Sequence, residues 1–148
     1  MSFQYKFQKI LTLKEREKDE SLHIYQESVK KFTAAAEHLY DLLKKKEDLE
    51  QFQSEELANG LSVDKIRHYQ YFISNLEKSI EHAQGLVIHA RNTMNWHEEK
   101  LKESNIEVKK YEKLKENSYQ AYMEVLNRTE NLNLDEFSQR QYFFRGGS

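Results

Sequence analysis

The sequence contains no cysteine and no proline, and only 4 of its 148 residues are glycine. The lack of cysteine excludes disulfides, thiol catalysis and metal sites built on cysteine. Proline and glycine are the residues that most often interrupt a helix, so their scarcity favours long helices. No stretch approaches the roughly 20 apolar residues of a membrane-spanning helix, and the N-terminus lacks the apolar run of a signal peptide. We therefore expect a helical, cytoplasmic protein.

Charged and aromatic residues are abundant instead. Charged residues make up 32% of the chain, which is typical of long helices and coiled coils. The aromatic share of 12% argues against simple disorder. The net charge is −2, and basic and acidic residues are interspersed, so no large basic face stands out. A nucleic-acid partner is therefore not expected.

The one clear interruption of helical sequence is Asn59-Gly60-Leu61-Ser62. Asn or Gly can adopt the left-handed conformation that ends a helix. Ser62 can then cap the next helix, and Asp64 falls in its favourable first turn. This pattern predicts two helices joined by a tight reversal; one continuous helix is the competing interpretation.

After this turn, apolar residues alternate by three and four positions in one register for about ten heptads, as in a coiled coil. Fifteen of the twenty seam positions are apolar or aromatic. The seam consists of Ile66, Tyr69, Ile73, Leu76, Ile80, Ala83, Val87, Ala90, Met94, His97, Leu101, Ser104, Val108, Tyr111, Lys115, Ser118, Tyr122, Val125, Thr129 and Leu132. Polar residues are more frequent after Leu101, so the far end should pack more loosely or depend on a partner.

Before the turn, a shorter seam is expected at Leu22, Tyr25, Val29, Phe32, Ala36, Leu39 and Leu43. Continuing it would place polar residues in the seam, whereas the apolar residues move to Leu42, Leu49, Phe52 and Leu57. This pattern predicts a stutter, a local slip of register within the coiled coil.

The expected fold is all-α, a long antiparallel two-helix coiled-coil hairpin with its turn at Asn59–Ser62. Its helices cover about 4–58 and 63–132. Equal rise along both helices would place Leu43 near Ser79 and Leu22 near Leu101, with the chain start reaching about residue 120. A new helix cap is expected at Asn133, so residues 133–148 would form a short amphipathic extension. Its apolar residues would be Phe137, Phe143 and Phe144, and the tail Arg145–Ser148 would be disordered.

The chain offers little for catalysis. Its six histidines show no metal-binding spacing, and no phosphate loop or nucleophile motif is present. A two-helix hairpin also encloses no pocket that could exclude water. We expect no enzyme activity, cofactor, metal or small-molecule substrate.

Two surfaces are candidates for binding partners because apolar residues lie off the expected seams. One is near the slip: Tyr40, Leu42, Leu49, Phe52, Tyr71, Phe72, Leu86 and Ile88. The other is at the open end, where Phe3, Phe7, Ile10 and Leu11 meet the C-terminal part of the second helix. Alternatively, the first set only widens the hairpin core and the second only closes it.

Three segments carry a family resemblance. The start from Phe3 to Glu15, the stretch His68–Ile80 and the stretch Leu134–Arg140 resemble, in order and spacing, the flagellar FliJ family. The likeness spans nearly the whole chain. It implies a component of the flagellar type III export apparatus, built as a two-helix coiled coil similar to the central stalk of rotary ATPases.

The resemblance also implies partners and sites. The open end would enter the hexameric export ATPase, with Phe3, Phe7, Ile10, Leu11 and Phe137 as contacts. Leu42, Phe72 and Leu76 would bind the cytoplasmic part of the export gate, and the protein would handle export chaperones. The resemblance thus places the protein in the cytoplasm, peripheral to the membrane at the flagellar basal body. A free, prefoldin-like coiled-coil chaperone and a generic coiled-coil spacer are the alternative functions.

Overall fold

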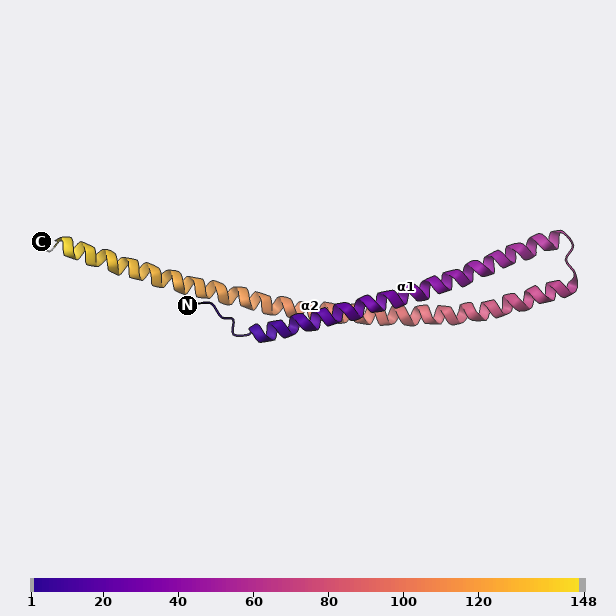
Figure 1. Ribbon diagram of the computed structural model, residues 1–148, viewed down its shortest axis with the longest axis horizontal. Helices are drawn as coiled ribbons and strands as arrows, with labels where there is room; N and C mark the ends of the chain where they lie inside the picture. Colours follow the sequence, from indigo (N-terminus) through magenta and orange to yellow (C-terminus); the bar gives the residue numbers. More distant parts are fainter. Residues whose placement is uncertain (1, 147–148) are drawn as a thin grey trace. The chain divides into compact units, whose positions relative to one another are not determined.

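The computed structural model describes residues 2–146, with side chains described as far as Tyr142. It contains two helices, α1 (Gln8–Ala58) and α2 (Val63–Gly146), which form an all-α hairpin (Figure 1). Residues 2–146 include no strand. The chain divides into two compact units. We call residues 19–102 the turn unit, and Met1–Lys18 with Glu103–Ser148 the terminal unit.

The turn between α1 and α2 has the conformation that its sequence predicts. Gly60 has a φ of 88°, in the left-handed region that favours glycine. The Asn59 and Gly60 N–H groups donate to the carbonyls of Glu56 and Leu57, at 3.1 and 3.2 Å. These bonds satisfy carbonyls that the end of α1 leaves without helical partners.

Ser62 caps the start of α2. Its Oγ accepts a hydrogen bond from the Lys65 N–H at 3.4 Å, and its carbonyl accepts the Ile66 N–H at 3.0 Å. Asp64 lies in the first turn of the helix, where a negative charge is favourable. The stop and restart inferred from Asn59–Ser62 are therefore confirmed, and a single continuous helix is excluded.

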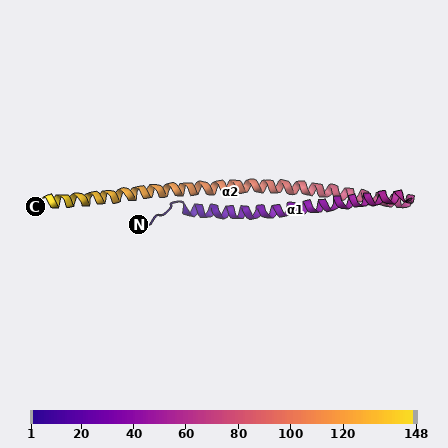
Figure 2. The same ribbon diagram turned by 90° about the horizontal axis from the view of Figure 1, so that it is seen from above.

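Within the turn unit, α1 and α2 lie side by side (Figures 1 and 2). The α2 seam is the one that the sequence predicts, and its buried members are Ile73, Leu76, Ile80, Ala83 and Val87. The pairing across the helices also agrees with the expected register to within one residue. It joins Phe52 to Tyr69, Lys46 to Glu77, and Phe32 to Arg91.

The stutter predicted in α1 is wrong. Leu22 and Leu43, members of the predicted seam, are 38% and 43% exposed. In the turn unit the shielded side of α1 instead follows one unbroken alternation of three and four residues. This alternation runs through Ser21, Tyr25, Ser28, Phe32, Ala35, Leu39, Leu42, Lys46, Leu49, Gln53 and Glu56. The predicted seam members Val29 and Ala36 are half-buried beside it. An α1 seam assigned from apolar residues alone has the wrong register, because several of the true seam positions are polar.

The polar seam residues of α1 are accommodated locally. The Ser28 hydroxyl donates to the Tyr25 carbonyl at 2.6 Å, so it can be buried without a missing hydrogen bond. Lys46 pairs with Glu50 at 3.7 Å and with Glu77 at 3.4 Å. Its aliphatic stem can cover the seam while its amine stays near the surface.

In the terminal unit, residues 2–7 are not helical and form what we call the arm. We expected the helix to start at about residue 4, but α1 begins at Gln8, whose N–H donates to the Tyr5 carbonyl at 3.1 Å. The core of this unit consists of Tyr5, Leu11 and Val108, and Phe3 and Tyr111 pack against it.

The C-terminal part of α2 continues past the arm as one helix to Gly146 (Figure 1). The new helix cap expected at Asn133 does not form. Asn and Asp cost a helix interior less than about 1 kcal/mol each, which is too little to break it without glycine or proline. Residues 124–142 are all exposed. The disorder expected of Arg145 and Gly146 is wrong, because both belong to α2. The roles expected of the Phe143 and Phe144 side chains and of Gly147-Ser148 lie outside the described residues.

Candidate partner-binding surfaces

The arm is held on α2 by its aromatic side chains. The Phe3 ring packs against those of Tyr119 and Tyr122, with centroids 5.4 and 5.5 Å apart. Tyr5 is buried, and its hydroxyl donates to the Tyr111 carbonyl at 2.9 Å. The arm thus covers α2 beyond the start of α1, and the chain start reaches Tyr119, as the sequence register predicts.

Burial raises the pKa of the Tyr5 phenol, and the neighbouring Tyr111 raises it further. Both effects disfavour the phenolate. The phenol therefore stays protonated at neutral pH and can donate its hydrogen bond to the Tyr111 carbonyl. This bond fixes the arm at its middle, while Phe3 fixes it near its start.

The open-end candidates differ in accessibility. Phe7 packs edge-on against Tyr5 and Tyr111, with centroids 6.0 and 6.5 Å apart, yet keeps an exposed face, as does Ile10. Leu11 is only 2% exposed and belongs to the core. It can therefore support this surface but cannot itself reach a partner.

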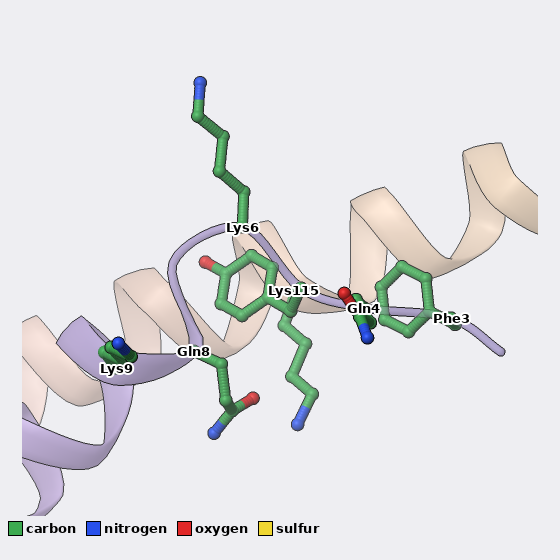
Figure 3. A pocket seen from close by; sticks show the side chains of 7 residues that line it. Phe3, Gln4, Lys6, Gln8, Lys9 and Lys115 are labelled. Atoms are coloured by element: carbon green, nitrogen blue, oxygen red, sulfur yellow. The ribbon is translucent and has the colours of Figure 1, made fainter.

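An open groove of about 710 Å³ lies beside the arm (Figure 3). The arm is an extended segment, which fills less space than a helix would. We call this open groove the arm groove. It is lined by Phe3, Gln4, Tyr5, Lys6, Gln8, Lys9 and Lys115. In Figure 3 the Gln8 and Lys115 side chains extend to the same side, whereas Lys6 extends to the opposite side.

Phe137 lies on the exposed part of α2 beyond the arm and is 58% exposed. The same part of the helix exposes other large apolar and aromatic side chains: Val125, Leu126, Leu132, Leu134 and Tyr142. None of the described residues of α1 packs against them. This part of α2 has the apolar content of a partner-binding site, because large exposed apolar patches are uncommon on monomeric proteins.

The second predicted surface lies in the turn unit. Phe72 is 46% exposed, Leu42 is half-buried, and Leu76 is buried in the seam. A partner can therefore touch Phe72 directly and part of Leu42, whereas Leu76 offers it little surface. The Lys46–Glu77 pair places Leu42 opposite a part of α2 about two turns beyond Phe72. Six of the eight off-seam residues singled out from the sequence are exposed: Tyr40, Phe52, Tyr71, Phe72, Leu86 and Ile88. They do not merely widen the core.

The described residues contain no group of three His, Asp or Glu side chains that could hold a metal ion. Within the same residues, no helix is long and apolar enough to cross a membrane. The clearest charge cluster is a local one, Lys102 with Glu98 and Glu99 at 3.6 and 3.3 Å. The hydrogen bond that Lys102 donates to Glu99 and the charges of both carboxylates raise the pKa of Lys102.

Two features of the terminal unit escaped the sequence reasoning. The first is the extended arm, although Phe3, Tyr5 and Phe7 are spaced by two, which is the period of an extended chain. The second is the arm groove. Its signal was the polar residue Lys115 at a position of the α2 seam.

The sequence of the whole chain points to one family. The family described as "Flagellar FliJ protein" matches residues 3–147. The chain is 47% identical over 146 residues to the flagellar FliJ protein of Bacillus subtilis (strain 168), covering 99% of each chain. No solved structure matches at a significant level. A match of this extent includes the arm, the turn and the C-terminal part of α2, and the chain therefore belongs to the flagellar FliJ protein family.

Proposed function

We propose that this chain is a non-enzymatic coupling and adaptor protein of the flagellar type III export apparatus. It acts as the central stalk of the hexameric export ATPase and links that ring to the export gate and to export chaperones. It works in the cytoplasm, at the membrane-associated flagellar basal body, and leaves ATP hydrolysis to the ring. The full-length family match carries this proposal, because that match covers both proposed contact surfaces.

The ring contact is assigned to the terminal unit. There the arm and the part of α2 beyond it expose aromatic and aliphatic side chains without a helical partner. Phe3, Phe7, Ile10 and Phe137 are the proposed contact residues, and Leu11 supports them from the core. An apolar face on a single helix is well suited to docking into a groove or pore.

The gate contact is assigned to the turn unit. Phe72 is the proposed anchor, with Leu42, about two helical turns away along the hairpin, as a second contact and the buried Leu76 as packing support. Exposed aromatic residues often contribute most to an interface because they bury a large area at little entropic cost. The chaperone-handling role follows from family membership and has no assigned residues.

Deletion of residues 1–12 and, separately, of residues 133–148 tests the ring contact. Each deletion should abolish co-purification with the export ATPase and remove the change in its hydrolysis rate and hexamer assembly. Phe72→Ala is the matched control and should leave both readouts intact. If the undeleted chain neither binds the ATPase nor alters its activity, the stalk role is excluded. If both deletions bind normally, a client chaperone becomes the better description.

Phe72→Ala tests the gate contact. We expect it to weaken binding to the cytoplasmic gate domain about tenfold, the usual effect of truncating an aromatic anchor. Trp96→Ala removes another exposed aromatic residue of α2, which lies outside both proposed surfaces, and it should change binding little. Equal affinities of the two variants, with helicity retained, would remove Phe72 from the interface.

A further inference from the structure

Lys115 occupies a position of the α2 seam where the heptad pattern calls for an apolar residue. The residue is half-buried and lines the arm groove. A lysine ammonium group has three hydrogen-bond donors and no acceptor, so it attracts anionic partners. The surroundings of this lysine therefore indicate what the groove can bind.

The chain contains a second seam lysine for comparison. Lys46 lies at a seam position of α1 and has two carboxylate partners, Glu50 and Glu77. Lys115 and the neighbouring Lys9 have no carboxylate within ion-pair distance among the described residues. One seam lysine is thus neutralised within the chain, and the other presents its charge to a groove.

The groove has one sign of charge. Lys6, Lys9 and Lys115 line it, and no Asp or Glu does. The Gln8 amide extends to the same side as Lys115 (Figure 3). Its Nε2 donates one hydrogen bond to the Thr12 hydroxyl at 3.4 Å, and its second N–H is a further donor. Phe3 supplies an apolar wall. Lysine and amide donors beside an aromatic surface suit a ligand that combines carboxylates with an apolar group.

We propose that the arm groove binds an acidic peptide segment of a partner protein, with its carboxylates at Lys9 and Lys115 and an apolar side chain against Phe3. Phe3 belongs both to the arm groove and to the proposed ring contact, so this proposal deepens the proposed function. It rests on that function only for the identity of the partner protein. A nucleic acid fits less well. It requires an extended basic face, and the charges here are confined to one groove on a chain of net charge −2.

The test uses the full chain alone and a fluorescent eight-residue peptide of Asp and Glu around one Trp. Binding is measured by fluorescence anisotropy, and helicity by circular dichroism. Lys115→Gln should weaken binding about tenfold, the usual scale for one charge-assisted contact. Lys9→Gln should weaken it several-fold. Adding salt should weaken it further, because the attraction is between charges.

Lys113→Gln is the matched control, because Lys113 lies two residues away on the exposed side of the same helix. It should bind the peptide as the natural chain does. A second control peptide replaces Asp and Glu by Asn and Gln and should bind at least tenfold more weakly, because its amides cannot pair with the lysines.

Three results would overturn the proposal. The first is absence of binding to the natural chain, and the second is an equal loss in Lys113→Gln and Lys115→Gln. The third is tighter binding of a single-stranded oligonucleotide that depends more strongly on Lys115 than peptide binding does. The ATPase is absent from this assay, so the groove proposal can fail while the ring contact stands, and the reverse also holds.

Discussion

In the turn unit, the two helices are held together by many similar contacts along a regular seam, whereas the terminal unit depends on one compact cluster around the arm. The turn unit buries aliphatic side chains one heptad after another and tolerates Ser28, Lys46 and Gln53 among them. The terminal unit joins Tyr5, Leu11 and Val108 in a single core. A distributed seam can lose one contact at modest cost, but a small cluster cannot.

Because the terminal unit depends on one cluster, Leu11→Ala should lower the free energy of unfolding more than any other substitution proposed below. Removing a fully buried leucine costs about 3 kcal/mol, and no neighbouring seam layer in this cluster compensates for the loss. Ile80→Ala in the turn unit should cost about 2 kcal/mol, because adjacent layers remain. Urea unfolding gives the free energy of unfolding of each variant, and hydrogen exchange shows which residues lose protection. Leu11→Ala should accelerate exchange at residues 103–122, and Ile80→Ala at residues 66–90; the same exchange pattern in both variants would contradict separate units.

The two seam lysines give the next largest effect. Lys46→Leu should stabilise the chain by about 1 kcal/mol, since a well-packed apolar residue often outperforms a partly buried ion pair. Lys115→Leu should also stabilise the chain, but it should weaken acidic-peptide binding about tenfold, as Lys115→Gln does, whereas Lys46→Leu should leave that binding unchanged. Thermal unfolding and the anisotropy assay measure both properties. Loss of stability in Lys46→Leu would mean that the pairs with Glu50 and Glu77 contribute more than packing would.

Two glycine substitutions test whether backbone conformation controls the turn. Gly60→Ala should destabilise the chain by about 1 kcal/mol, because alanine at a φ of 88° is strained although no atom blocks its Cβ. Gly85→Ala lies in the helical part of α2, also with open space around the Cβ, and should stabilise by about 0.5–1 kcal/mol. Thermal unfolding of both variants reports the signs. The same sign in both would show that backbone conformation does not control the turn.

The smallest effect concerns the arm at high pH. Burial keeps the pKa of Tyr5 above its ordinary value of about 10, so the folded arm favours the neutral phenol. The resulting stability is present below pH 10 and is lost as the pH rises through the raised pKa of the folded state. The difference between the ultraviolet titration curves of the natural chain and the Tyr5→Phe variant isolates the Tyr5 phenol. A midpoint at or below 10 would show that the phenol is not held in the core.

The sequence located most of the fold but only part of the surfaces. The α2 seam was readable because its apolar residues keep one register, and the turn was readable because Gly60 and Ser62 have specific backbone roles. The α1 seam was misread because Ser28, Lys46 and Gln53 occupy positions where apolar residues were sought. Among the predicted contact residues, burial separates Leu11 and Leu76 from the exposed Phe7, Phe72 and Phe137.

The sequence by itself determined two helices, their turn and their antiparallel register, because these follow from local backbone preferences and from the heptad period. It also carried the family membership, which rests on residue identity along the whole chain. Only the tertiary structure decided that the arm is extended, because its conformation depends on Tyr5 and Phe3 packing against α2, more than 100 residues away in the chain. The same packing leaves the groove beside the arm and places Lys115 there, since an extended segment fills less space than a helix would.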